Sequence, residues 1–239
     1  MKQSRKHTTA NLLAVGLIFG LTATVVIAQG KRADDAARRS NKAANAIKAI
    51  MGAPDRGIPR DLLEKAEAVV VCPEVVKAAL GIGGRRGQCV VSRRTASWWT
   101  TPVYYNMNGG SFGVQIGAEK LDLVLLVINK DGVNGLLEDK FEMGGEAGIA
   151  AGPVGRTASA STNATLDAGI LSYSRSKGAF IGAAIKGVAI SPDNDLNQDF
   201  YGRKASELLG EGTMTATPAR VRTFPDTLSR YRKANARVS

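Results

Sequence analysis

The sequence predicts an α+β fold: a mostly antiparallel, strongly curved, glycine-rich β-sheet or partial barrel with peripheral helices. The first observation is a series of short apolar and β-branched segments separated by turn residues, which is typical of antiparallel strands. The second is the shortage of helical stretches long enough to connect parallel strands. The third is the count of 27 glycines in 239 residues, which permits close backbone packing and the bends of a curved sheet.

Residues 1–28 have the three-part layout of a secretory signal peptide. A basic start precedes an apolar run from Leu12 to Ile27, and the small residues Val26 and Ala28 stand where a signal peptidase cuts, before Gln29. The run is slightly long for a signal peptide and slightly short for a membrane span, so an uncleaved anchor is the alternative. We expect an exported chain, periplasmic or secreted, that can associate peripherally with a membrane.

The charge of the chain favours anionic partners. The formal net charge is +11, and removal of the three lysines and arginines in the first segment leaves 29 basic and 21 acidic residues, or +8. Export argues against nucleic acid as the partner. An anionic lipid or membrane surface is therefore the expected partner.

His7, the single histidine, lies inside the predicted signal segment. A mature chain without histidine cannot run a Ser-His-Asp or Cys-His mechanism, and it lacks the commonest transition-metal ligand. The aspartates form no recognisable calcium loop. We expect a protein that is not an enzyme, with no cofactor and no metal site.

Residues 29–57 are expected to form a helical N-terminal arm. Alanine and lysine from Arg32 to Met51 favour helix, and Gly52 and Pro54 end it. Two roles stay open for this helix. It is either a solvated arm that packs lightly on the domain or an amphipathic helix that touches a membrane.

The folded domain is expected over residues 58–212, followed by a basic, partly helical tail over 213–239. The segment Glu74–Leu80 is predicted as one or two helical turns. Helices are also expected over Pro59–Ala66, Asp131–Lys140, Asn194–Leu209 and, exposed and basic, Thr227–Ala234. Strands are expected over Ala68–Cys72, around Val90–Val91, and over Trp98–Tyr105, Ser111–Gly117, Leu121–Asn129, Phe141–Ala151, Thr165–Tyr173 and Ala179–Ile190.

Three glycine- or serine-rich segments carry cations and are the candidate binding sites. Each also fits an ordinary polar turn, and the first matches neither phosphate-binding glycine motif. Arginine can hold a phosphate through paired hydrogen bonds. If the segments lie at one end of the sheet, they form one basic rim for a lipid headgroup. The residues are Arg85 and Arg86 in Gly81–Gly87, Arg156 in Gly152–Arg156, and Arg175 and Lys177 in Ser172–Gly178.

Four aromatic residues cluster in one stretch: Trp98, Trp99, Tyr104 and Tyr105. Aromatic side chains can lie at a membrane interface. Packing within and along the edge of the sheet is the favoured interpretation.

The two cysteines, Cys72 and Cys89, each lie in a predicted strand. An even count in an oxidising compartment favours a disulfide. Two separate buried thiols are the alternative.

Several motifs, in this order and spacing, resemble those of the SYLF domain family over roughly residues 45–212. That domain occurs in yeast actin-patch proteins with Src-homology-3 modules, in a related animal phosphoinositide-binding protein, and in many bacterial exported proteins. The resemblance implies lipid binding, with actin binding in the yeast branch, and no catalysis. The motifs are Ile58–Leu63, Gly83–Arg85 leading to Val90–Val91, Gly109–Gly117, Ala151–Arg156, Ser172–Gly178 and Phe200–Gly202.

The sequence thus predicts a non-enzymatic domain that binds anionic phospholipid or phosphoinositide-like headgroups outside the cytoplasm. The alternative is an envelope scaffold or protein-interaction module, with actin binding by family analogy and no lipid specificity.

Overall fold

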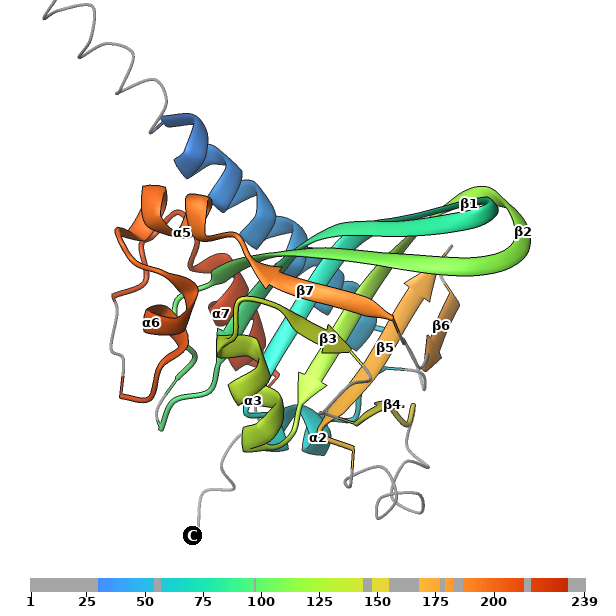
Figure 1. Cartoon of the computed structure of the whole chain (residues 1–239). Coiled ribbons are helices and arrows are strands. Elements are labelled where there is room, and N and C mark those ends of the chain that lie inside the picture. The colour runs from blue at the N-terminus through green and yellow to red at the C-terminus, as the bar shows by residue number, and fades with distance from the viewer. Residues whose placement is uncertain are drawn as a thin grey trace, which may run out of the picture.

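The protein folds into a curved sheet with helices around it (Figure 1). The predicted signal segment, Arg156 and Lys177 lie outside the part of the chain that the structure describes. That part of the computed structural model comprises residues 30–53, 57–96, 98–143, 148–154, 168–176, 179–182, 187–212 and 216–231.

Two long strands dominate the sheet, and the other elements are short. After a helix over residues 30–51, the elements in chain order are α2 (Arg60–Lys65), β1 (Ala68–Arg93), β2 (Val103–Val127), α3 (Lys130–Leu137), β3 (Phe141–Met143), β4 (Ile149–Ala151), β5 (Ile170–Ser176), β6 (Ala179–Gly182), β7 (Val188–Pro192), α5 (Asn194–Tyr201), α6 (Ala205–Leu209) and α7 (Thr223–Arg230).

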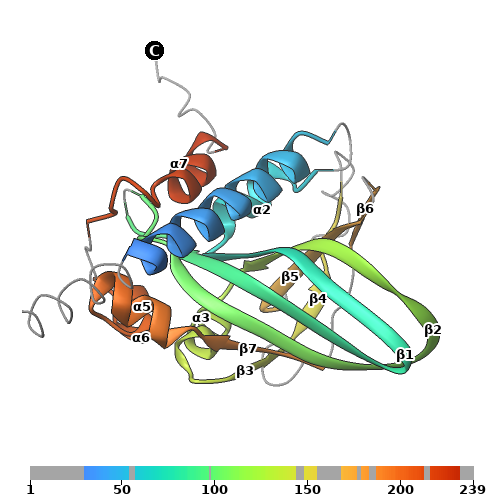
Figure 2. The ribbon, with the colours of Figure 1, turned by 90° about the horizontal axis from the view of Figure 1, so that it is seen from above.

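β1 and β2 form one antiparallel hairpin. The pairing runs from Val91 opposite Val103, beside the hairpin tip, to Ala68 opposite Val127 at the far end. Near the middle of its length this two-stranded ribbon bends and returns, as Figures 1 and 2 both show. The bend divides the hairpin into two halves, which we call its limbs, and each limb forms a separate part of the sheet.

We call residues 76–86 of β1 and 108–120 of β2 the elbow. The register shifts between Leu80 and Ile82, so that one residue of β1 faces residues 113–115 of β2. Extra residues in one strand of an antiparallel pair bend the strand and increase its twist. This unequal count is the physical reason for the bend.

The bend brings the two halves of β1 together. Cys72 and Cys89 are joined by a disulfide, with their Cα atoms 4.0 Å apart; these are the residues for which the sequence favours a bridge. A Cβ atom at Gly87 would lie 2.9 Å from Cγ2 of Val75, so only glycine permits this approach of the two limbs. The base of the elbow is thereby fixed.

The described part of the sheet has seven strands, with the order β3-β7-β2-β5-β4, while β1 pairs with β2 and β6 pairs with β5. β7 pairs with the Tyr105–Gly109 part of β2, and β5 pairs with the Leu121–Val127 part. These pairs are antiparallel, and β4 is parallel to β5. The predicted fold class, a mostly antiparallel and strongly curved α+β sheet, is confirmed.

Two buried clusters lie on the opposite faces of the sheet. In β1, Val70 and Cys72 belong to a cluster that includes α3 and α6. Val69 and Val71 belong to a second cluster with the N-terminal helix, α2 and α7. Successive strand residues point to opposite faces, so this part of β1 is buried on both sides.

The N-terminal helix of residues 30–51 belongs to the core. Its residues Ala36, Ala43, Ile47 and Ile50 are fully buried in the second cluster, and Figure 2 shows the helix lying beside α7. The sequence left two roles open for this helix, light packing on the domain and contact with a membrane. Both are wrong for its apolar face, because that face is buried against the sheet. No described helix is long and apolar enough to cross a membrane.

The prediction of helical turns over Glu74–Leu80 is wrong, since this segment is part of β1 and pairs with β2. Ile82–Gly87 is likewise paired strand at the elbow and not a tight turn, and Gly81 lies at the register shift. Long-range pairing overrides the local preference for helix, because each strand hydrogen bond is made with a residue far along the chain.

The other boundaries shift by a few residues. Asn194–Leu209 is two helices separated at Gly202, which has a φ of 70° that glycine adopts without strain. α7 begins at Thr223, before the predicted start, and it is not simply exposed, because Phe224 and Leu228 are buried.

Candidate functional site

Arg85 lies at the base of the elbow, on the same strand face as Gly87 and Cys89. Its side chain is half-buried, and its Nε is buried without a hydrogen-bond partner among the described residues. An unpaired buried donor is unfavourable unless a partner reaches it. Arg85 is therefore the candidate cation with the clearest unused capacity for a ligand.

Arg85 lines an open hollow of 570 Å³ between the elbow and the β3–β7 edge. Glycine backbone from both sides and Asn108 form part of its wall, and Lys140 adds a second cation. Lys140 pairs with Glu142 at 2.5 Å, so its charge is partly compensated. The hollow suits a small anionic group.

Arg86 is the next residue of β1 and points to the opposite face of the strand, where it is exposed. The two neighbouring arginines therefore do not converge on one small ligand. They offer cations on both sides of the elbow base.

Arg175 lies on β5, directly opposite Asp122 of β2. Its guanidinium is 3.8 Å from the Asp122 carboxylate, and both side chains are partly buried. A bound anion would compete with this carboxylate for the cation. Arg175 is therefore a weaker candidate than the sequence suggested.

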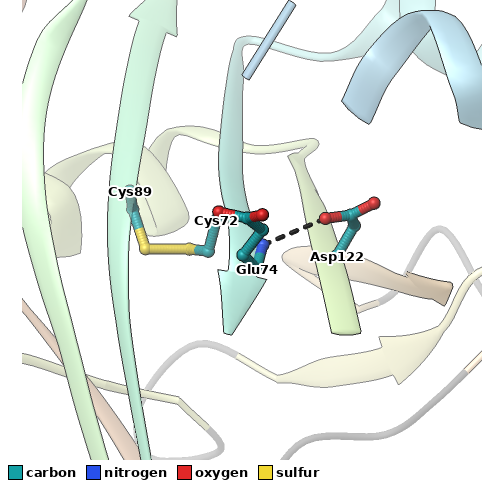
Figure 3. Close-up of a disulfide and its surroundings, with 4 residues drawn as sticks. All are labelled: Cys72, Glu74, Cys89 and Asp122. Atoms are coloured by element: carbon teal, nitrogen blue, oxygen red, sulfur yellow. Dashed lines mark hydrogen bonds between the residues drawn. A yellow bond between two sulfur atoms is a disulfide. The ribbon is translucent and has the colours of Figure 1, made fainter. Parts of the chain in front are cut away.

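A polar cluster lies beside the disulfide (Figure 3). Glu74 has a φ of 51°, which is unusual for a residue other than glycine. Its backbone N–H donates to Asp122 at 3.0 Å, and its carboxylate accepts from Lys42 of the N-terminal helix. The hydrogen bond and charge of Lys42 lower the pKa of Glu74. This cluster ties the N-terminal helix to both long strands.

The predicted basic rim is not assembled by any contact among the described residues. Arg85 and Arg86 lie at the elbow, whereas Arg175 is paired with Asp122 on the other limb. Arg156 and Lys177 fall outside the described residues. The rim stays a prediction.

Trp98 is the exposed aromatic residue of its stretch. Trp99, Tyr104 and Tyr105 are buried, as expected for packing, but Trp98 at the tip of the β1–β2 hairpin is 50% exposed. From the sequence, the same interpretation, packing within and along the edge of the sheet, is favoured for all four residues. Trp98 and Trp99 both lie between β1 and β2, whereas Tyr104 and Tyr105 lie within β2. No signal in the sequence separates exposed Trp98 from buried Trp99, whose ring is covered by Arg94.

The buried hydroxyl groups are structural. Burial raises the pKa of Tyr104 to about 12, although hydrogen bonds with Ser40 and Tyr201 lower it. Burial also raises the pKa of Tyr105 and of Tyr201. These phenols are neutral at ordinary pH. No group of three potential metal ligands occurs within the described residues.

Comparison with known proteins identifies the family of this chain. The profile of the Ysc84 family, described as "Las17-binding protein actin regulator", matches residues 108–231. This span begins inside the elbow and ends after α7. The chain belongs to the Ysc84 family. The resemblance to SYLF domains is thereby confirmed, and export stays a prediction.

Named relatives of this Ysc84 domain come from yeast and animals. "LAS seventeen-binding protein 3" of Saccharomyces cerevisiae is 31% identical over 175 residues, covering 71% of this chain and 38% of the relative. "Protein YSC84" of the same yeast is 31% identical over 175 residues, with 71% and 37% covered. The human "SH3 domain-containing YSC84-like protein 1" is 28% identical over 150 residues, with 62% and 44% covered. The matched region is thus less than half of each relative.

Proposed function

We propose that this Ysc84 domain is a non-enzymatic module that binds a protein. The observation that carries the proposal is the family match, since the profile and the yeast relatives are named for binding and regulation. Those names point to two partner proteins, actin and LAS seventeen. Binding of a protein is the alternative to lipid binding that the sequence predicts.

The surface feature that supports a protein partner is Trp98. Trp98 N–H donates to Thr95 Oγ1 at 2.9 Å, and Thr95 N–H donates to the Trp98 carbonyl at 2.8 Å. Beside this turn, Arg94 stacks on Trp99 at 4.2 Å and donates to the Ala66 carbonyl. The indole is therefore exposed on a fixed backbone. Pre-ordered tryptophans are enriched among the residues that dominate protein interfaces.

The test is binding of the purified domain to actin filaments by co-sedimentation and to LAS seventeen by titration calorimetry. We expect Trp98→Ala to weaken binding to whichever of these two proteins the domain binds. The expected loss of affinity is about thirtyfold, which is the effect of losing a dominant interface residue. Val154→Ala, which trims another exposed apolar side chain, is the matched control. Absence of binding to both proteins would contradict the proposal.

A second candidate function is binding of an anionic lipid headgroup. The specific observation that favours it is the unpartnered Nε of Arg85 beside the hollow. Exposed Arg86 adds a cation at the same end. We expect the domain to sediment with phosphatidylserine vesicles and less with phosphatidylcholine vesicles, and salt to weaken the binding. Arg85→Gln with Arg86→Gln would reduce it. Equal sedimentation with both vesicle types would exclude this candidate.

A further inference from the structure

We propose that the elbow of the β1–β2 hairpin inserts shallowly into the interface of an anionic lipid bilayer. This inference rests on the second candidate function and assigns the membrane-contacting element, which neither the family names nor the predicted cations specify. The elbow lies at one extremity of the molecule in both views of the ribbon (Figures 1 and 2). It can therefore reach a flat surface without interference from the helices.

The composition of the elbow changes along its length. Its tip, residues 78–84 and 109–118, contains no charged residue. Large apolar residues occur at paired register positions there, Leu80 opposite Ile116 and Ile82 opposite Phe112. An uncharged, apolar segment at an extremity is a feature of membrane-contacting elements.

Several described residues of the elbow are exposed. Val76 is 41% exposed, which makes it one of few large apolar side chains in that state among the described residues. Ala118, on the other strand of the ribbon, is also exposed, as are Gly84 and Gly110. Paired residues and residues two apart in a strand share a face, so Val76, Ala78, Ala118 and Lys120 lie on one face of the ribbon. That face is exposed where the elbow leaves the body of the domain.

Basic residues lie where the elbow joins the rest of the sheet. Arg86 and Lys120 are exposed at its base, and half-buried Arg85 precedes Arg86 in β1. When an apolar tip enters the headgroup layer, cations at its base come level with lipid phosphates. Each basic residue near an anionic surface favours binding on its own. The uncharged tip and the basic residues at the base thus follow one another along the length of the elbow.

The backbone limits the depth of insertion. Pairing of β2 with β7 ends at Gly109, and its pairing with β5 begins at Leu121. Between these points the described pairing of β2 is with β1 alone, so among the described residues one edge of each strand has no strand partner. Unpaired amide groups are unfavourable in hydrocarbon. The elbow therefore stays among headgroups and water, and the disulfide joins the two halves of β1 next to its base.

A fluorescent reporter tests the contact directly. Ala118→Cys is labelled with an environment-sensitive dye; Cys72 and Cys89 are buried in a disulfide and do not compete. The label should brighten and shift to the blue with vesicles of phosphatidylcholine and phosphatidylserine. Ser206→Cys on α6, an exposed position away from the elbow, should show no such change.

Charge insertion tests the energetics. Val76→Asp with Ala118→Asp should weaken binding to the same vesicles by about thirtyfold, because two anions enter an anionic interface. The control, Gln198→Asp with Ser206→Asp, makes the same charge change at exposed positions on α5 and α6. Its binding should change by less than about threefold. Circular dichroism establishes that all variants are folded.

The two hypotheses fail in distinguishable ways. If the wild-type domain does not bind the anionic vesicles, both headgroup binding and elbow insertion are wrong. If it binds while the Ala118 label is silent, the elbow inference alone is overturned. Binding of the Val76 and Ala118 double variant equal to that of its control would overturn it as well.

Discussion

Arg39 of the N-terminal helix donates a hydrogen bond of 2.8 Å to Asp193, the residue that caps α5, 154 positions later in the chain. A second ion pair joins Arg39 to Asp35 at 2.9 Å. Arg39 is 8% exposed and Asp193 13%. The first helix is thus connected through a buried charge to the region that the family profile matches.

Arg39→Met should destabilise the protein by about 3–5 kcal/mol, because removing one partner leaves the Asp193 carboxylate buried without its counter-charge. Urea denaturation followed by circular dichroism measures the loss. Arg38→Met is the control: its side chain is 57% exposed, and loss of such a pair costs about 1 kcal/mol or less. Equal losses in the two variants would show that burial of the pair contributes nothing.

Replacing Cys72 and Cys89 together by alanine should lower the free energy of unfolding by about 3 kcal/mol, since the bridge closes a short loop and restricts the unfolded chain. The sequence separation of the bridge is 17. Peptide mapping without reductant should recover the two cysteines linked. Two free thiols in protein made in an oxidising compartment would contradict the bridge.

Gly152→Ala should cost about 1–3 kcal/mol through overpacking. A Cβ atom at Gly152 would lie 2.1 Å from the ring of Tyr173, which is fully buried. Gly110→Ala is the matched change, because a Cβ atom there meets nothing within 4 Å. Thermal unfolding of the two variants gives the comparison. A midpoint for Gly152→Ala as high as that of the control would mean that Tyr173 can move aside.

The free energy of unfolding should fall as the pH rises from 10 towards 12. The pKa of Tyr104 is raised from 10.0 to about 12 by burial, so above pH 10 the phenol ionises in the unfolded chain before it ionises in the folded one. Tyr104 alone should contribute a loss of about 2–3 kcal/mol by the upper end of this range. Denaturant titrations at stepped pH measure it.

Tyr104→Phe provides the check on that assignment. The variant loses a hydrogen bond to the Ala36 carbonyl and about 1 kcal/mol at neutral pH. Its alkaline loss should be smaller than that of the wild type. An unchanged alkaline slope would assign the effect to the other buried tyrosines.

Export is the remaining proposal from the sequence. Cleavage after Ala28 should leave Gln29, or its cyclised form, at the N-terminus of secreted protein. Mass spectrometry of the intact chain distinguishes this from a retained Met1, which would indicate an anchor.

The sequence alone predicted the elements whose signals are local. Apolar and β-branched residues marked Ala68–Cys72 and Leu121–Asn129 as strands, and Gly52 marked the end of the first helix. The class of fold followed from the spacing of such segments and from the glycines, and the family resemblance followed from the order of short motifs.

The tertiary structure alone decided how distant segments meet. Glu74–Leu80 has helical character locally but is a strand, because β2 supplies its hydrogen bonds from more than 30 positions away. The N-terminal helix has a thin apolar face that reads as solvated, yet it is buried because α7 and the sheet cover it together. Arg85 and Arg175 look equivalent in sequence, but Arg175 lies opposite Asp122 whereas Arg85 lies opposite Gly109. Pairing, burial and charge compensation depend on residues far apart in the chain, and local sequence patterns carry little information about which of those residues become neighbours.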